Sequence, residues 1–174
     1  MSSVTIKEFY QDILGGSCRD IDQFLNENIN SDIGHFNVFD ISEIYRTSTS
    51  KTQMPYNRRT YYKISLISGQ NRVEYADKTI EINDCAVLFA SPKIPYNYTH
   101  LCNNQSGLFC VFTKDFLPTS KIGVDLDNLP VFSPQSDFIY QISTEQFHQF
   151  EAVFLKMHEE IKSDYHYKYD LLRN

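Results

Sequence analysis

Apolar residues recur at helical spacing near both ends of the chain and at strand spacing between them. Near the start, Thr5 and Glu8 match a capping box and open an apolar helical face, which predicts a helix that ends at Gly15-Gly16. A second, shorter helix is expected over Asp20–Leu25. Residues 1–34 are therefore interpreted as a short helical segment that packs on the part that follows.

Residues 35–143 carry aromatic and β-branched runs that are broken by Gly, Asn and Pro. Their spacing of about 8–12 residues is typical of an all-β sandwich or barrel. A tight hairpin turn is expected at Ala76-Asp77-Lys78. The predicted strands are His35–Ile41, Arg59–Ile67, Arg72–Tyr75, Lys78–Ile82, Ala86–Ala90, Tyr96–Leu101, Gly107–Thr113 and Phe138–Ile142.

In residues 144–174 the apolar period changes to alternating steps of three and four, which is a heptad seam. Thr144 is expected to cap this helix, and Ser163 with Asp164 to cap a second one that reaches Asn174 without a stop signal. We expect this segment to form a helical dimer interface; the alternative is that its stripe covers the barrel. The interface residues would be Phe147, Phe150, Phe154, Met157, Ile161, Tyr165, Tyr169 and Leu172.

Composition narrows the class of protein. With 41% hydrophobic and 22% charged residues, the 174-residue chain is neither disordered nor a membrane protein, and no apolar run approaches the about 18 residues that span a bilayer. A net charge of −6 opposes direct binding of nucleic acid. The start lacks the pattern of a signal peptide, so a cytoplasmic location is expected. Cys102 and Cys110 could pair across a hairpin, but ordinary buried thiols are favoured in a reducing compartment.

Three segments in a fixed order carry a resemblance to a known family: Tyr61–Gly69, Tyr75–Lys78 and Leu88–Tyr96. They resemble the N-terminal domain of AraC-family transcriptional regulators, and Tyr62–Leu66 with Ser163–Asn174 add to the likeness. The resemblance covers nearly the whole chain. It implies a mainly β fold, a cupin barrel (double-stranded β-helix or jelly roll) with short N-terminal helices and a C-terminal helical dimerisation segment.

The same resemblance implies a function. The chain would be the ligand-sensing and dimerising half of a regulator, truncated before the two helix-turn-helix motifs that bind DNA in the full-length protein. A small-molecule effector in the barrel would shift the arrangement of the C-terminal helices. The expected partners are a second copy of the chain and an effector. No enzymatic activity, no cofactor, no membrane and no direct DNA contact are expected.

Metal binding is the usual property of enzymatic cupins, and their ligand pattern is not met. The pattern falls on Asn57, Arg59, Lys63 and Tyr96, none of which is an imidazole or a carboxylate. We therefore expect a metal-free barrel.

Tyrosines are dense in the predicted barrel, and a basic cluster accompanies them. Rings with hydroxyls suit a small-ligand pocket, and Arg59 with Lys63 could hold a carboxylate or phosphate; the alternatives are core filling and a solvated rim. The cupin pattern turns Arg59 and Lys63 inward, whereas hydrophobic alternation turns Tyr62, Ile64 and Leu66 inward, and both readings are open. The candidate ligand-binding residues are Arg59, Tyr61, Lys63, Tyr75, Tyr96, Tyr98 and His100.

Two other functions are kept as alternatives. One is a metal-free cupin enzyme of the sugar epimerase or isomerase type, with a His and a Tyr as acid and base, for which only His100 lies in a barrel strand. The other is a constitutive dimerisation domain whose barrel is filled by side chains.

Overall fold

The computed structural model describes residues 3–14, 33–47, 53–102 and 105–174. The helix expected over Asp20–Leu25, together with Gly15-Gly16 and Cys18, lies outside these residues. The helices are α1 (Ile6–Leu14), α3 (Ile41–Thr47), α4 (Thr119–Ile122), α5 (Thr144–Lys162) and α6 (Lys168–Leu172), with 3-10 turns η1 (Lys114–Phe116), η2 (Leu126–Asn128) and η3 (Pro130–Phe132). The strands are β1 (Ser3–Val4), β2 (Phe36–Asp40), β3 (Gln53–Arg59), β4 (Tyr62–Ser68), β5 (Asn71–Tyr75), β6 (Lys78–Ile82), β7 (Cys85–Ala90), β8 (Tyr96–His100), β9 (Ser106–Phe112) and β10 (Ile139–Gln141).

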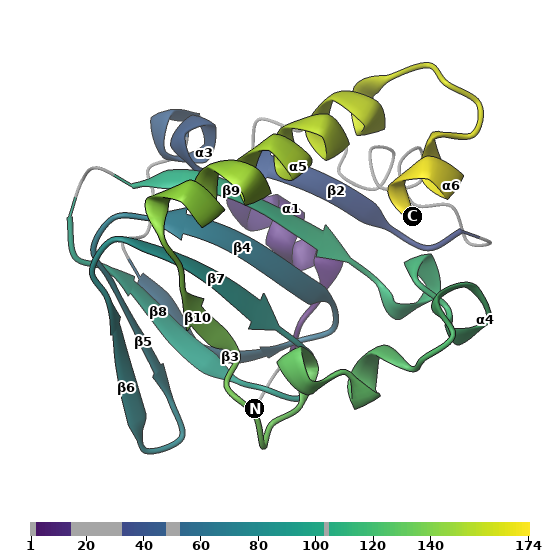
Figure 1. Ribbon diagram of the computed structural model, residues 1–174. Helices are drawn as coiled ribbons and strands as arrows, with labels where there is room; N and C mark the ends of the chain where they lie inside the picture. Colours follow the sequence, from purple (N-terminus) through teal and green to yellow (C-terminus); the bar gives the residue numbers. More distant parts are fainter. Residues whose placement is uncertain (1–2, 15–32, 48–52, 103–104) are drawn as a thin grey trace.

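The strands β2 to β9 are wound as a jelly roll (Figure 1). Two sheets have the strand orders β1-β3-β8-β5-β6 and β10-β7-β4-β9-β2. Strand β2 pairs with β9, β3 with β8, β4 with β7 and β5 with β6, and every pair is antiparallel. This nested pairing is the double-stranded β-helix, so the expectation of a mainly β, cupin-type domain is confirmed.

The predicted strands are present, with one correction. The run Arg59–Ile67 is not a single strand, because β3 ends at Arg59, Thr60 and Tyr61 form a bend, and β4 begins at Tyr62. The chain passes from one sheet to the other at this corner. The hairpin between β5 and β6 is confirmed, and Ala76 adopts the left-handed φ of 50° that such a tight turn requires.

The side chains of β4 alternate between two interiors, which resolves the two readings of its facing. Tyr62 and Leu66 belong to a core outside the barrel, whereas Lys63 and Ile67 point into the barrel. Both sets are buried because this sheet is covered on both faces. The cupin pattern therefore gives the correct inward face, and the hydrophobic alternation marks the face that packs under α5.

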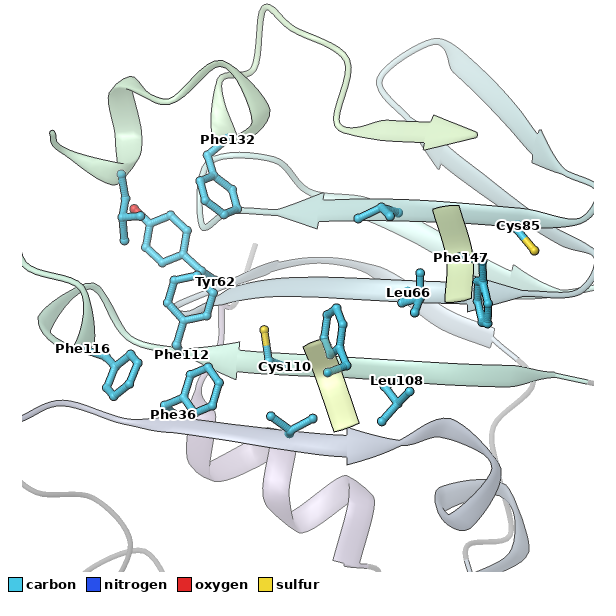
Figure 2. Close-up of a cluster of buried hydrophobic side chains, with 14 residues drawn as sticks. Phe36, Tyr62, Leu66, Cys85, Leu108, Cys110, Phe112, Phe116, Phe132 and Phe147 are labelled. Carbon is cyan, nitrogen blue, oxygen red and sulfur yellow. The ribbon is translucent and has the colours of Figure 1, made fainter. Parts of the chain in front are cut away.

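Helix α5 lies across the outer face of β7, β4, β9 and β2 (Figure 1). Its Phe147 and Phe154 are 6% and 4% exposed and pack on Leu66, Leu108 and their neighbours, as Figure 2 shows for the labelled side chains. Burial of one phenylalanine contributes about 1.5–3 kcal/mol. The helix is thus held to the barrel by its own apolar stripe.

Most of the stripe that the sequence assigns to a dimer interface packs on the chain itself, which is a correction to that prediction. The intramolecular contacts are made by Phe147, Phe154, Met157, Ile161, Tyr169 and Leu172. Phe150 and Tyr165 are 43% and 53% exposed, so a role in a dimer stays a prediction for these two.

The helix boundaries at the C-terminal end also differ from the prediction. The cap of α5 is Ser143 rather than Thr144, because the Ser143 hydroxyl accepts from the Gln146 N–H at 3.2 Å and the Gln146 side chain accepts from the Ser143 N–H at 3.0 Å. Ser163 does not start a helix, since α6 begins only at Lys168. The Lys168 ammonium donates to the carbonyls of Ile161 and Ser163, which closes the C-terminal end of α5.

Arg173 fixes α6 to the barrel. Its guanidinium donates to the Phe116 carbonyl and to the Ile33 carbonyl, both at 2.8 Å, and lies 5.1 Å from the Phe116 ring centre. Ile33 precedes β2 and Phe116 follows β9, so one side chain joins the helix to both ends of the β2–β9 pair.

At the N-terminal end, the predicted capping box of α1 is confirmed, because the Thr5 N–H donates to Glu8 at 2.6 Å and the Glu8 N–H donates to the Thr5 hydroxyl at 3.2 Å. Phe9 and Tyr10 of this helix pack with Tyr61 and other residues on the inner side of β9. None of the described helices combines the length and the apolar character needed to cross a bilayer.

We expect Gly107→Ala to destabilise the fold by about 2–4 kcal/mol. Gly107 has a φ of +126°, and an added Cβ would lie 2.1 Å from the Leu66 carbonyl oxygen of the neighbouring strand. Gly123→Ala is the matched control: its φ is +74°, but the added Cβ meets nothing within 4 Å, so a cost of only about 1 kcal/mol is expected. Urea unfolding of both variants measures the difference, and equal losses would contradict this packing.

Candidate functional site

The corner between β3 and β4 brings three of the predicted ligand-binding residues together inside the barrel. Arg59 ends β3, Tyr61 lies in the bend, and Lys63 is the second residue of β4. Their side chains are 7%, 3% and 7% exposed. Their contacts place all three inside the barrel. Arg59 lies over the Tyr96 ring, Tyr61 packs against Phe9 of α1, and Lys63 lies over the Phe109 ring.

Lys63 is the most unusual member of this group. Its ammonium lies 3.9 Å from the centre of the Phe109 ring, and among the described residues it has no hydrogen-bonding or ion-pair partner. Burial, and then the charge of Arg59, lower the pKa of Lys63 from 10.5 to about 7. A buried cation of this kind is costly unless something neutralises it.

Arg59 adds a second cation at the same place. Its guanidinium stacks 4.0 Å from the centre of the Tyr96 ring on the neighbouring strand β8. It also makes a hydrogen bond with Tyr61, and burial raises the pKa of the Tyr61 hydroxyl, which stays protonated at neutral pH. Asp12 of α1 is the acidic side chain whose charge acts on Tyr61. Arg59, Tyr61, Lys63, Tyr96 and Phe109 thus form one group, called the basic corner below.

Tyr98 and His100 form a second polar group further along β8. The Tyr98 hydroxyl donates to the Asn71 side-chain oxygen at 2.7 Å, and Nδ1 of His100 lies 2.9 Å from that same oxygen. Because an amide oxygen only accepts, His100 carries its proton on Nδ1. Burial lowers the pKa of His100 and raises that of Tyr98.

Tyr75 does not join either group. It lies at the tip of the β5–β6 hairpin, where its ring packs edge-on against Phe138 at 4.4 Å and Lys78 lies over it. Tyr75 is half-buried and packs on the edge of the barrel core, apart from the other candidates, so a ligand-binding role for it stays a prediction. In the sequence, Tyr75 is a tyrosine in a predicted barrel strand, like Tyr96 and Tyr98. Only its position at the tip of the hairpin sets it apart from them.

Sequence reasoning missed several residues that complete these groups. Asn71 is fully buried and accepts from two candidates, and Phe109 supplies the surface under the Lys63 ammonium. Asn71 follows a Gly-Gln turn and reads as a turn residue, so nothing in its surroundings marks it as buried. Phe109 and Leu108 are neighbours in an apolar run and point to opposite faces of the sheet. Because both faces are apolar in sequence, the run does not show which of the two residues lies next to a cation.

A third buried polar group ties α1 to β2. The Tyr10 hydroxyl lies 2.9 Å from Nε2 of His35 and accepts from the Asn37 side chain at 2.9 Å. Tyr10 and His35 are each 1% exposed. On the other side of β2, a hollow of 280 Å³ lies against α5 and α6 and is lined partly by Lys162 and Lys168. This hollow is outside the barrel.

Neither a metal cluster nor a disulfide is found among the described residues. They contain no group of three or more His, Cys, Asp or Glu side chains placed to hold an ion. Cys85, Cys102 and Cys110 are free thiols, and burial raises the pKa of Cys110 to about 12, as expected for an inert core cysteine. The prediction of ordinary buried thiols holds for Cys110, whereas Cys102 is only half-buried.

Comparison with protein-family models gives no match, and comparison with curated proteins gives none either. Among solved structures, ToxT from Vibrio cholerae O395 bound to (E)-4-(8-methylnaphthalen-1-yl)but-3-enoic acid is 17% identical over 80% of this chain and 54% of that one, with a TM-score of 0.46. An apo ToxT variant from strain SCE256 is 15% identical over 83% of this chain and 53% of that one, with a TM-score of 0.49. A cupin protein from Bacteroides fragilis is 12% identical over 46% of this chain and 64% of that one, with a TM-score of 0.31.

The chain therefore spans about half the length of the ToxT structures that it matches. These likenesses are too distant to assign a family or a ligand to it. The cupin-type fold is established by the strand pairing described above.

We expect Lys63→Met to stabilise the protein by about 1–3 kcal/mol, because an apolar chain of similar length replaces a buried, unpartnered cation. The direction in which folding stability changes with pH follows from the two pKa values of Lys63, folded and unfolded. Since the folded pKa is about 7 and the unfolded value 10.5, the unfolded state binds more protons between them, and the wild type gains stability as pH rises through that window.

The advantage of Lys63→Met should then be greatest at pH 6 and shrink towards pH 10. Chemical denaturation across this range measures it. Lys156→Met on the exposed side of α5 is the matched control and should be near neutral at all pH values. A destabilised Lys63→Met protein at pH 6 would mean that the ammonium has a partner that offsets its burial.

Proposed function

We propose that this chain is the ligand-sensing and dimerising domain of an AraC-like transcriptional regulator, with a metal-free barrel that binds a small molecule bearing an acidic group. The observation that carries the proposal is the basic corner. Two cations lie within the barrel, and Lys63 has no neutralising partner among the described residues. A carboxylate or phosphate bound there would offset the cost of burying the Lys63 ammonium.

The polar interior favours sensing over a filled barrel. A constitutive dimerisation domain needs only an apolar core, whereas this interior buries Arg59, Lys63, Ser65 and Asn71. The aromatic rings of the basic corner supply the apolar surface that ligand sites combine with a few placed polar groups.

The metal-free enzyme is the weaker alternative. Tyr98 and His100 lie side by side, with ring centres 4.9 Å apart, but both direct their polar atoms at the oxygen of Asn71. The Tyr98 proton is held by Asn71 and burial raises the pKa of its hydroxyl, so Tyr98 is poorly suited to act as the acid or base of the pair.

Strand β4 offers a route from the effector to the helices. Lys63 on its inner face lies beside Tyr62 and Ile64 on its outer face, and these belong to the core that holds α5. An effector that displaces the inner side chains of β4 also shifts the outer side chains against which α5 packs. The arrangement of two such helices in a dimer would then change. DNA contact would belong to another part of the regulator, since this chain carries a net charge of −6.

We expect benzoate to stabilise the protein and benzamide, its uncharged match in shape, to have little effect. At ten times the dissociation constant the gain is about 1.4 kcal/mol, or about 3–6 °C in Tm. Thermal unfolding at constant ionic strength measures it. Arg59→Met should abolish the benzoate effect, and an equal response to both compounds would contradict recognition of the acid.

We expect a dimer at tens of micromolar, formed through the exposed flank of α5 that carries Phe150 and Val153 (43% and 54% exposed). Phe150→Asp should give a folded monomer whose Tm falls only by the share that dimerisation contributes, because the side chain is outside the core. Leu155→Asp, 46% exposed elsewhere on α5, is the control and should stay dimeric. Light scattering after size exclusion measures the molar mass of each protein. A wild type with the mass of one chain would contradict the dimer.

A further inference from the structure

The amine of Lys63 has the surroundings that make a lysine nucleophilic. A lysine in water is an ammonium ion without a free electron pair, and it reacts slowly with carbonyl groups. Desolvation and a neighbouring cation both favour the neutral amine. Lys63 has both, since its Nζ lies against the Phe109 ring, has no hydrogen-bonding partner among the described residues and faces the charge of Arg59. Burial and the charge of Arg59 lower its pKa to about 7, which favours the neutral amine far more than in an exposed lysine.

The two neighbours of Lys63 supply what a reaction with a carbonyl compound needs. Arg59 is a guanidinium that can hold a carboxylate through two parallel hydrogen bonds. Tyr61 makes a hydrogen bond with Arg59 and is kept protonated by burial, so its hydroxyl can donate a hydrogen bond to the oxygen of a ligand. An electrophile placed between them has an acid group on one side and the amine on the other.

We propose that Lys63 binds a 2-oxo acid or a small aldehyde acid covalently, as a reversible imine, with the acid group of the ligand on Arg59. This inference rests on the proposed function, because it names the chemical class of the acidic ligand in the barrel. Both groups are buried in the barrel, and the charge of Arg59 acts on Lys63, so a ligand with a carbonyl next to a carboxylate could engage the two together.

The step balances without any further reagent. The amine electron pair attacks the carbonyl carbon and forms a C–N bond, and the carbonyl oxygen takes up a proton. The nitrogen loses both of its hydrogens as the oxygen leaves as water, so the products are the imine and one water. Nothing is oxidised or reduced, and addition of water reverses the reaction. The neutral imine also removes the buried ammonium charge.

The test is reductive trapping with pyruvate as the probe. The full chain is incubated with pyruvate and sodium borohydride, and the adduct is located by peptide mass mapping. We expect Lys63 to be modified before any exposed lysine. The adduct should be absent from Lys63→Met and present to the same extent in Lys156→Met as in the wild type. The initial rate of trapping should rise about tenfold per pH unit below pH 7 and level off above it, whereas an exposed lysine continues to gain up to its ordinary pKa near 10.5.

Lys63→Arg provides a second variant that keeps the charge and removes the primary amine, and it should lose the adduct. Adducts spread over exposed lysines, with Lys63 unmodified, overturn the imine. If benzoate still stabilises the wild type in that case, the acidic ligand site stands and only the covalent step is wrong. If benzoate has no effect either, both proposals are wrong.

Discussion

The sheet that contains β4 is buried on both faces, and the rest of the structure depends on this constraint. A strand with one wet face alternates apolar and polar residues, but β4 must satisfy a core on each side. Its outer residues hold α5 to the barrel, and its inner residues form part of the basic corner. The helical cover and the polar interior are therefore two sides of one strand.

This arrangement also explains how the fold tolerates Lys63. An unpartnered buried ammonium opposes folding, and the aromatic surfaces of Phe109 and the outer core offset it. The core under α5 is well packed, with Phe147, Phe154 and Leu66 all nearly inaccessible, so the cost is confined to the inside of the barrel.

Much of the fold follows from the sequence, because turns and strand runs are local signals. The hairpin at Ala76 and the capping box of Thr5 are set by residues close in the chain, and both are found. The direction of the Tyr62 side chain and the packing of Phe154 depend on α5 covering the outer face of the β4 sheet. This contact joins segments far apart in the sequence, so no local pattern predicts it. The same is true of the site: Arg59 and Lys63 were found from their charge, but Asn71 became visible only as the oxygen that Tyr98 and His100 share.

The nested pairing of the strands has a consequence for how the chain folds. The β5–β6 hairpin has the shortest loop, and each pair outside it, from β4–β7 through β3–β8 to β2–β9, closes a longer one. Once an inner pair has formed, the next has less chain entropy to lose, so the barrel assembles from the hairpin outward. Arg173 can bind both of its carbonyl acceptors only once the outermost pair, β2–β9, has brought Ile33 and Phe116 together, so its two hydrogen bonds depend on the completed barrel.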